Sequence, residues 1–137
     1  MGYGSPSYVV EQNGNVIKYT LDRTDFDRRE RKTFCLIIEW LNDFIKCRLF
    51  SDNDIRIINI INEDIVNIEK LIKENNFFEL KNKDIEENDR CSGHWHEKHS
   101  LEIKIGDKYN HVSTHPIKMS SNKYFNSIIW YLSKLIE

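Results

Sequence analysis

The feature of this chain that most constrains its fold is a β-hairpin pattern at residues 8–21, centred on Asn13-Gly14. An Asn-Gly pair favours a two-residue hairpin turn because both residues tolerate a positive φ. The flanking residues pair so that one face of the two strands is apolar, as in a half-buried sheet. A second hairpin is predicted at residues 100–114, with its turn near Gly106-Asp107. Two hairpins together predict an antiparallel sheet.

The register of the second hairpin stays open on the sequence alone. A two-residue loop places Val112 opposite Leu101, whereas a three-residue loop places Tyr109 and His111 on the face of Leu101. The residues of the turn are compatible with both loops.

Three stretches carry apolar residues at helical spacing and are predicted to be helices. The first spans about residues 25–48, and the second begins at Asn62 and ends at Asn75-Asn76. The third begins at Ser120 or Ser121. Their apolar stripes consist, in order, of Phe34, Ile37, Ile38, Leu41, Phe44 and Ile45; of Ile65, Ile68, Leu71 and Ile72; and of Phe125, Ile128, Ile129, Leu132, Leu135 and Ile136.

The predicted elements form one α+β domain at residues 1–137, with an antiparallel sheet built from hairpins and three helices packed on it. β-branched residues at 55–61 add a strand, and the apolar segment 77–80 either packs under the second helix or starts another strand. A length of 137 residues with 39% hydrophobic content suits a single core. The residues expected at its centre are Leu41, Ile68, Ile103, Ile128 and Leu132.

Charge, cysteine content and hydropathy bear on partners and compartment. The net charge is −2 with acidic and basic residues interspersed, which argues against a nucleic-acid partner. No apolar run is long enough to span a membrane, so no membrane partner is expected. Three widely spaced cysteines and no signal segment predict a cytoplasmic protein. Residues 1–7 are expected to be a disordered tail or an artificial leader; if that leader replaces a signal segment, the protein is periplasmic or secreted.

The stretch CSGHWHEKH is the strongest candidate for chemistry, because one cysteine and three histidines fall within nine positions. In an extended segment His94 and His96 point to one side, where they would be the first two ligands of a zinc or copper ion. Cys91 or His99 would supply the third ligand. No standard zinc spacing is matched, so we favour a polar loop anchored by Trp95, without a cofactor.

Catalytic signatures are missing from the sequence, which has no phosphate-binding loop, dinucleotide-binding motif or nucleophile elbow. Cys91 could act with His111 or His115 as its base, but no third group that would orient the base can be named. An enzyme is therefore not expected, and a small hydrolase with a site assembled from scattered residues is kept as an alternative.

Aromatic residues beside the apolar stripes are the candidate interface residues. Trp40 flanks the first predicted stripe, Tyr124, Trp130 and Tyr131 flank the last, and Trp95 lies in the histidine-rich stretch. Aromatic side chains that are exposed together would anchor a protein interface, whereas buried ones would complete the edge of the core.

The second half of the chain combines a Phe-rich step, a loop with Gly and Trp, a hairpin that ends in a Tyr–Val strand, a proline and a final helix. The residues that carry this pattern are Phe77, Phe78, Leu80, Gly93, Trp95, Gly106, Tyr109, Val112, Pro116, Phe125, Ile128, Tyr131, Leu132 and Leu135. Over residues 65–136 it resembles small bacterial α+β domains of uncharacterised function, and its outline is similar to that of emfourin-like protease inhibitors. The resemblance implies a binding role and supplies no catalytic residues.

These features predict a small non-catalytic binding module that acts through its surface on a protein partner, as an inhibitor, immunity protein or adaptor does. A metal-binding protein that uses the segment from Cys91 to His99 is the first alternative, and the small hydrolase is the second. The oligomeric state is left open.

Overall fold

A six-stranded antiparallel sheet forms the centre of the computed structural model, with the strand order β4-β3-β2-β1-β5-β6. The model describes residues 14–25, 28–42, 44–52, 54–81, 95–113 and 123–136, without the side chains of 95–97, 123 and 124. The strands are β1 (Asn15–Asp25), β2 (Glu30–Leu41), β3 (Phe44–Ser51), β4 (Asp54–Ile57), β5 (Trp95–Ile105) and β6 (Lys108–Ser113).

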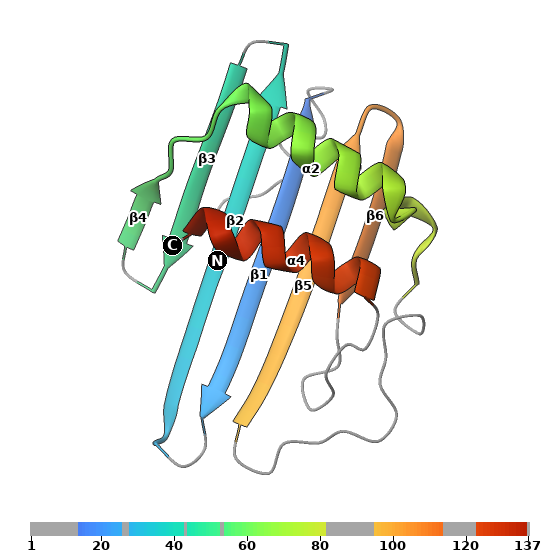
Figure 1. Cartoon of the computed structure of the whole chain (residues 1–137). Helices are drawn as coiled ribbons and strands as arrows, with labels where there is room; N and C mark the ends of the chain where they lie inside the picture. The colour runs from blue at the N-terminus through green and yellow to red at the C-terminus, as the bar shows by residue number, and fades with distance from the viewer. Residues whose placement is uncertain are drawn as a thin grey trace.

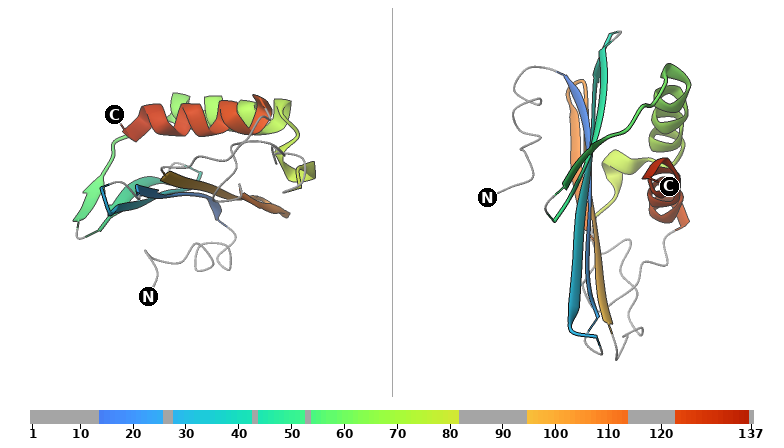
Figure 2. Two further views of the ribbon diagram at one scale, coloured as in Figure 1. Left: turned by 90° about the horizontal axis from the view of Figure 1, so that it is seen from below. Right: turned by 90° about the vertical axis from the view of Figure 1, so that its left-hand side faces the viewer.

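Two α-helices lie side by side on one face of this sheet, as Figures 1 and 2 show. They are α2 (Asn62–Glu74) and α4 (Lys123–Ile136), and the short 3-10 helix η1 (Phe77–Glu79) follows α2. Within the described part of the chain, no helix covers the opposite face of the sheet. Nor is any described helix both long and apolar enough to cross a bilayer.

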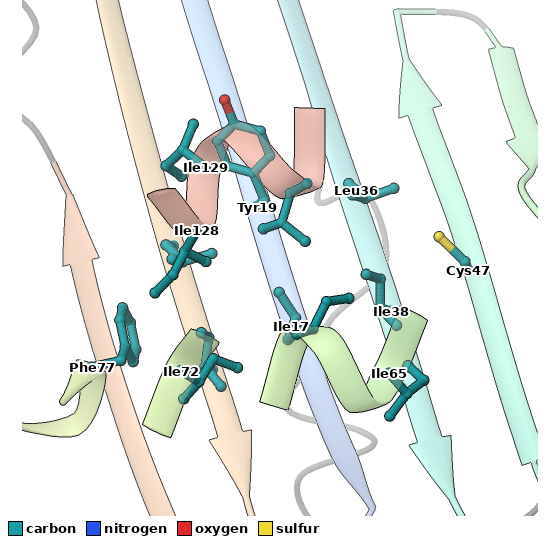
Figure 3. Close-up of a cluster of buried hydrophobic side chains, with 14 of the residues drawn as sticks. Ile17, Tyr19, Leu36, Ile38, Cys47, Ile65, Ile72, Phe77, Ile128 and Ile129 are labelled. Carbon is teal, nitrogen blue, oxygen red and sulfur yellow. The ribbon is translucent and has the colours of Figure 1, made fainter. Parts of the chain in front are cut away.

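The main core fills the space between the helices and the sheet. Figure 3 shows Ile65 and Ile72 of α2 and Ile128 of α4 in one cluster with Ile17 and Ile38 of the sheet. All five are at most 6% exposed. The helices therefore bury one apolar stripe each against the face of the sheet that they cover.

The predicted architecture of three helices on a sheet is wrong, because the stretch predicted as the first helix is the hairpin of β2 and β3. The strand β2 buries apolar side chains on both of its faces, with six consecutive buried residues from Cys35 to Trp40. A strand buried on both faces reads as a near-continuous apolar run, which also satisfies helical spacing. The α+β class and the antiparallel sheet are confirmed, but the described chain has two α-helices instead of three.

The two predicted hairpins have different outcomes. The strand β1 is paired with β2 on one edge and with β5 on the other along nearly its whole length, so neither edge is free for the predicted partner at residues 8–12. Those residues lie outside the described chain. The hairpin of β5 and β6 is confirmed with Val112 opposite Leu101, the register of a two-residue loop. Its turn uses Gly106 at φ 61°, a conformation that glycine adopts without strain.

The two helical predictions at 62–76 and at the C-terminus are confirmed, with changes at their ends. Ile61 stands at the N-cap of α2 in place of the predicted Asn62, and its N–H donates to the Asp64 carboxylate over 3.0 Å. The helix ends before Asn76, whose φ is 52°. Of the five residues expected at the centre of the core, four are buried; Leu41 is 45% exposed, because it ends β2 on the face without helices.

Candidate functional site: the uncovered face of the sheet

The face of the sheet opposite α2 and α4, here called the uncovered face, is the most distinctive surface of the described chain. Directly opposite residues of antiparallel strands point to the same side, so the strand registers assign its members. They are Val16, Lys18, Thr20, Asp22 and Thr24; Arg31, Thr33, Cys35, Ile37, Glu39 and Leu41; Phe44, Lys46, Arg48 and Phe50; Ile55 and Ile57; Lys98, Ser100, Glu102 and Lys104; and Tyr109, His111 and Ser113.

The half of this face formed by β2, β3 and β4 carries four exposed apolar side chains. Leu41 and Phe44 are 45% and 56% exposed, and Ile55 and Ile57 are both 62% exposed. Together with Tyr109, they make five of the eight exposed large hydrophobic residues in the described chain. Such side chains are normally scattered singly, so their concentration on one face indicates an interaction surface.

A small buried cluster lies beside these exposed residues on the same face. It consists of Val16, Cys35, Ile37 and Phe50, which are at most 9% exposed although neither helix lies on this side. Burial raises the pKa of the Cys35 thiol, which keeps it protonated. The one thiol of this cluster is therefore a poor nucleophile at neutral pH.

The uncovered face has two ion pairs and, besides them, more cationic than anionic groups. Arg48 donates to the largely buried Glu39, and Arg31 donates to Asp22 over 2.8 Å. The hydrogen bond from Arg31 is the main reason why the pKa of Asp22 is lowered. The whole face carries six Lys and Arg residues against three carboxylates, in a chain whose net charge is −2. The face is thus more positive than the molecule as a whole.

A polar hollow of about 240 Å³ occupies the other half of this face, over β1, β5 and β6. Within it, Ser100 Oγ lies 2.6 Å from Nε2 of the exposed His111. A neutral imidazole in this position can accept the serine proton, as a general base does. In the described chain no carboxylate is hydrogen-bonded to the other ring nitrogen of His111, and the pair is open to solvent. The arrangement therefore lacks the orienting group that a serine hydrolase needs.

Glu102, which also lines this hollow, is hydrogen-bonded to Tyr109 of β6. The Tyr109 hydroxyl donates to the Glu102 carboxylate, which lies directly opposite His111 in the register. Burial, that hydrogen bond and the negative charge of Glu102 raise the pKa of Tyr109 to about 12. The phenol is therefore a stable hydrogen-bond donor at neutral pH.

A cleft of about 670 Å³ lies between α2, η1 and the β5–β6 turn. Its floor is apolar and includes Ile72, Phe78 and Ile105, and its rim carries residues of both charges. Asn110 holds η1 to β6, because its side-chain amide donates to the carbonyls of Phe77 and Leu80 over 2.8 and 2.7 Å. The volume lies within the range of ligand pockets.

The predicted metal ligands are only partly within the described chain. Cys91 and His94 lie outside it, and the side chain of His96 is not described. His99 is half-buried on the covered side, where its Nδ1 lies 2.7 Å from the Tyr19 hydroxyl. Positions 96 and 99 are three apart in the continuous strand β5, which assigns them to opposite faces. The described residues contain no group of three potential ligands close enough to hold a metal ion.

The five candidate interface aromatics do not form one surface. Trp40 is 5% exposed and belongs to the main core, so the prediction that it contributes to an interface is wrong. Tyr131 is half-buried on α4, and its hydroxyl hydrogen-bonds with Asn67 and Asp64 of α2. Trp130 is 62% exposed on α4 and lies under the Lys134 ammonium. The side chains of Trp95 and Tyr124 are not described.

The sequence pattern missed the apolar residues of the uncovered face. Leu41 and Phe44 were placed in the core stripe of a helix, and Ile55 and Ile57 in a strand of unknown orientation. The alternation of the apolar residues Ile45, Cys47 and Leu49 with Lys46 and Arg48 was the available signal for a strand with one solvent-facing side.

Comparison with known proteins assigns no function to this face of the sheet. No protein-family model matches the chain, and no curated protein matches it. The resemblance to emfourin-like inhibitors over residues 65–136 is not tested by these comparisons and stays a prediction.

Proposed function

We propose that this chain is a small non-catalytic binding domain that contacts a protein partner with the uncovered face of its sheet, in the manner of an inhibitor, immunity protein or adaptor. One observation carries the proposal: most of the exposed large hydrophobic residues of the described chain lie on the one face that no described helix covers. The binding role needs no cofactor.

The charge of the uncovered face predicts what kind of surface the partner presents. Lys46 lies between the exposed Phe44 and the Arg48–Glu39 ion pair, and lysines continue across β1 and β5. We infer that the partner presents apolar side chains surrounded by carboxylates, because complementary charge steers association and excludes wrong partners. Apolar groups at the centre of such an interface supply most of the affinity.

A cytoplasmic location is part of the proposal. Within the described chain Cys35 and Cys47 are free thiols and both are buried. Burial raises the pKa of Cys47 to about 12, so that this thiol resists oxidation. Free, unreactive thiols suit a reducing compartment.

Capture of the partner from cells that make the protein tests the proposal, with the wild type and two matched variants as bait. Phe44→Asp changes the uncovered face at a residue that is 56% exposed, and Val66→Asp makes the same kind of change on α2 at a residue that is 61% exposed. We expect a protein captured by the wild type and by Val66→Asp to be reduced at least about tenfold with Phe44→Asp, the loss of one anchor residue. Its retention should also fall as salt is raised.

Other outcomes would reject the proposal. Retention by Phe44→Asp with loss by Val66→Asp would place the interface on the helices. Capture of nucleic acid would reject the protein partner, and the absence of any specific ligand from the wild-type bait would reject the binding role.

A further inference from the structure

The outer edge of β4 is suited to pairing with a second copy of itself. The strand β4 forms one border of the sheet, and its four residues are all exposed (Figures 1 and 2). It contains no lysine, proline or bulge, three of the features that keep an edge strand from pairing, and its two charged residues, Asp54 and Arg56, are of opposite sign. We propose that two copies of this chain associate through antiparallel β4–β4 pairing about a two-fold axis.

The hydrogen-bond ladder identifies which backbone groups face outward. On the inner edge, Ile58 N–H donates to the Cys47 carbonyl over 2.9 Å. Hydrogen-bonded and non-hydrogen-bonded pairs alternate along an antiparallel ladder, so Arg56 and Asp54 also direct their backbone groups toward β3. The N–H and C=O groups of Ile55 and Ile57 are therefore the ones that point away from the sheet.

Charge selects one register for the pairing. A two-fold axis normal to the sheet keeps both faces continuous. Within β4, only an axis at Ile55 or at Arg56 pairs three residues of each strand with one another. At Arg56 it would bring this residue against Arg56 of the partner subunit. At Ile55 it places Asp54 opposite Arg56 of the partner subunit, twice by symmetry, in non-hydrogen-bonded pairs where side chains lie closest. Opposite charges directly across a pair stabilise it and like charges destabilise it, so the axis lies at Ile55.

The same register brings apolar groups together on the uncovered face. Ile55 is 62% exposed, and it would lie directly against Ile55 of the partner subunit while their backbones exchange hydrogen bonds. The uncovered faces of both copies would then form one continuous surface. Because β4 has only four residues, we expect a reversible dimer with a dissociation constant in the micromolar range, on the order of 10–100 µM. This inference goes beyond the proposed function and is independent of the partner's identity.

Variants that exchange the charges across the two-fold axis test the pairing. Analytical ultracentrifugation of the full chain over a range of concentrations measures the dissociation constant of each dimer. Arg56→Asp would place carboxylates opposite each other, and Asp54→Arg would do the same with guanidinium groups. We expect each to weaken dimerisation about ten- to a hundredfold. The double variant Asp54→Arg/Arg56→Asp recreates both pairs and should restore it.

The double variant also controls for a contact within the monomer. Arg56 Nη2 donates to the Ile136 carbonyl over 2.6 Å, and both Arg56→Asp and the double variant lose this bond. Restoration by the double variant therefore reports pairing between subunits, and circular dichroism verifies that each variant is folded. A wild type that stays monomeric at about 1 mM, tenfold above the expected range, would overturn the proposal. So would a dimer that Arg56→Asp leaves unchanged, or a double variant no tighter than Arg56→Asp.

Discussion

Truncation of Ile128 should destabilise the fold strongly, because this side chain connects α4 to the sheet. Ile128 is 1% exposed and belongs to the main core (Figure 3). Ile128→Ala removes three carbon atoms, a transfer loss of about 2.4 kcal/mol at ~0.8 kcal/mol for each buried group. The cavity left behind adds to this loss, so we expect the free energy of unfolding to fall by about 3–5 kcal/mol.

Urea denaturation followed by tryptophan fluorescence and circular dichroism measures this change, and the same helix supplies the control. Trp130, two residues further along α4, is 62% exposed. Trp130→Ala should lower the free energy of unfolding by less than about 1 kcal/mol, the scale of its contact with Lys134. Equal losses for the two variants, or a loss below about 0.5 kcal/mol for Ile128→Ala, would refute the packing of α4 described above.

Three further predictions concern thiols, charge and backbone strain. In a Cys91→Ser background, the thiols of Cys35 and Cys47 should resist alkylation by iodoacetamide at pH 8 until the protein unfolds. The reason is that both are buried and that burial raises the pKa of Cys47 to about 12. Fast labelling of the folded protein would contradict this burial. Arg31 holds the pKa of Asp22 below 3.8, so their pair contributes stability above the unfolded pKa near 3.9 and loses it as the pH falls through the lower folded value. Arg31→Gln should therefore cost less than about 1 kcal/mol at pH 7 and progressively less below pH 4, by urea denaturation at each pH. Arg29 has a φ of 53°, so Arg29→Gly should leave stability unchanged or raise it by up to about 1 kcal/mol, whereas a clear loss in thermal unfolding would show that the side chain itself matters.

Local signals predicted α2, α4 and one hairpin correctly. The helix α2 is amphipathic, because Ile65, Ile68 and Ile72 recur at helical spacing among polar residues. The β5–β6 hairpin has a glycine where its turn needs a positive φ. Each of these features depends on residues close together in the chain, so the sequence alone could specify it.

Long-range pairing decided the parts that the sequence could not predict. The run from Cys35 to Trp40 fits a helix and a strand equally well, and only its position between β1 and β3 makes it a strand. The Asn13-Gly14 signal identified the start of β1 but not its neighbours, since β2 and β5 occupy both of its edges. Tertiary contacts override local preference in such cases.

The candidate site is defined by the apolar side chains that are exposed in the folded chain, and the sequence does not show which these are. Phe44 and Ile57 look like core residues in the sequence, and they are exposed because Phe44 lies beside the β2–β3 turn and Ile57 lies in the edge strand β4, on the face that no described helix covers. Trp40 was one of the candidate interface residues and is buried, because its side chain lies on the face that the helices cover. Residue type alone could not separate these cases.

Methyl NMR with the captured partner tests the central claim, that the uncovered face is the binding surface, most directly. The Cδ1 methyl groups of Ile55 and Ile57 should shift or broaden on addition of the partner, and that of the exposed Ile61, at the start of α2, should not. If the partner binds this face, the methyl signals that change on its addition should come from β4 and from the half of the uncovered face formed by β2 and β3. Perturbations confined to Ile61 and the exposed side of α2, with Ile55 and Ile57 unchanged, would contradict it.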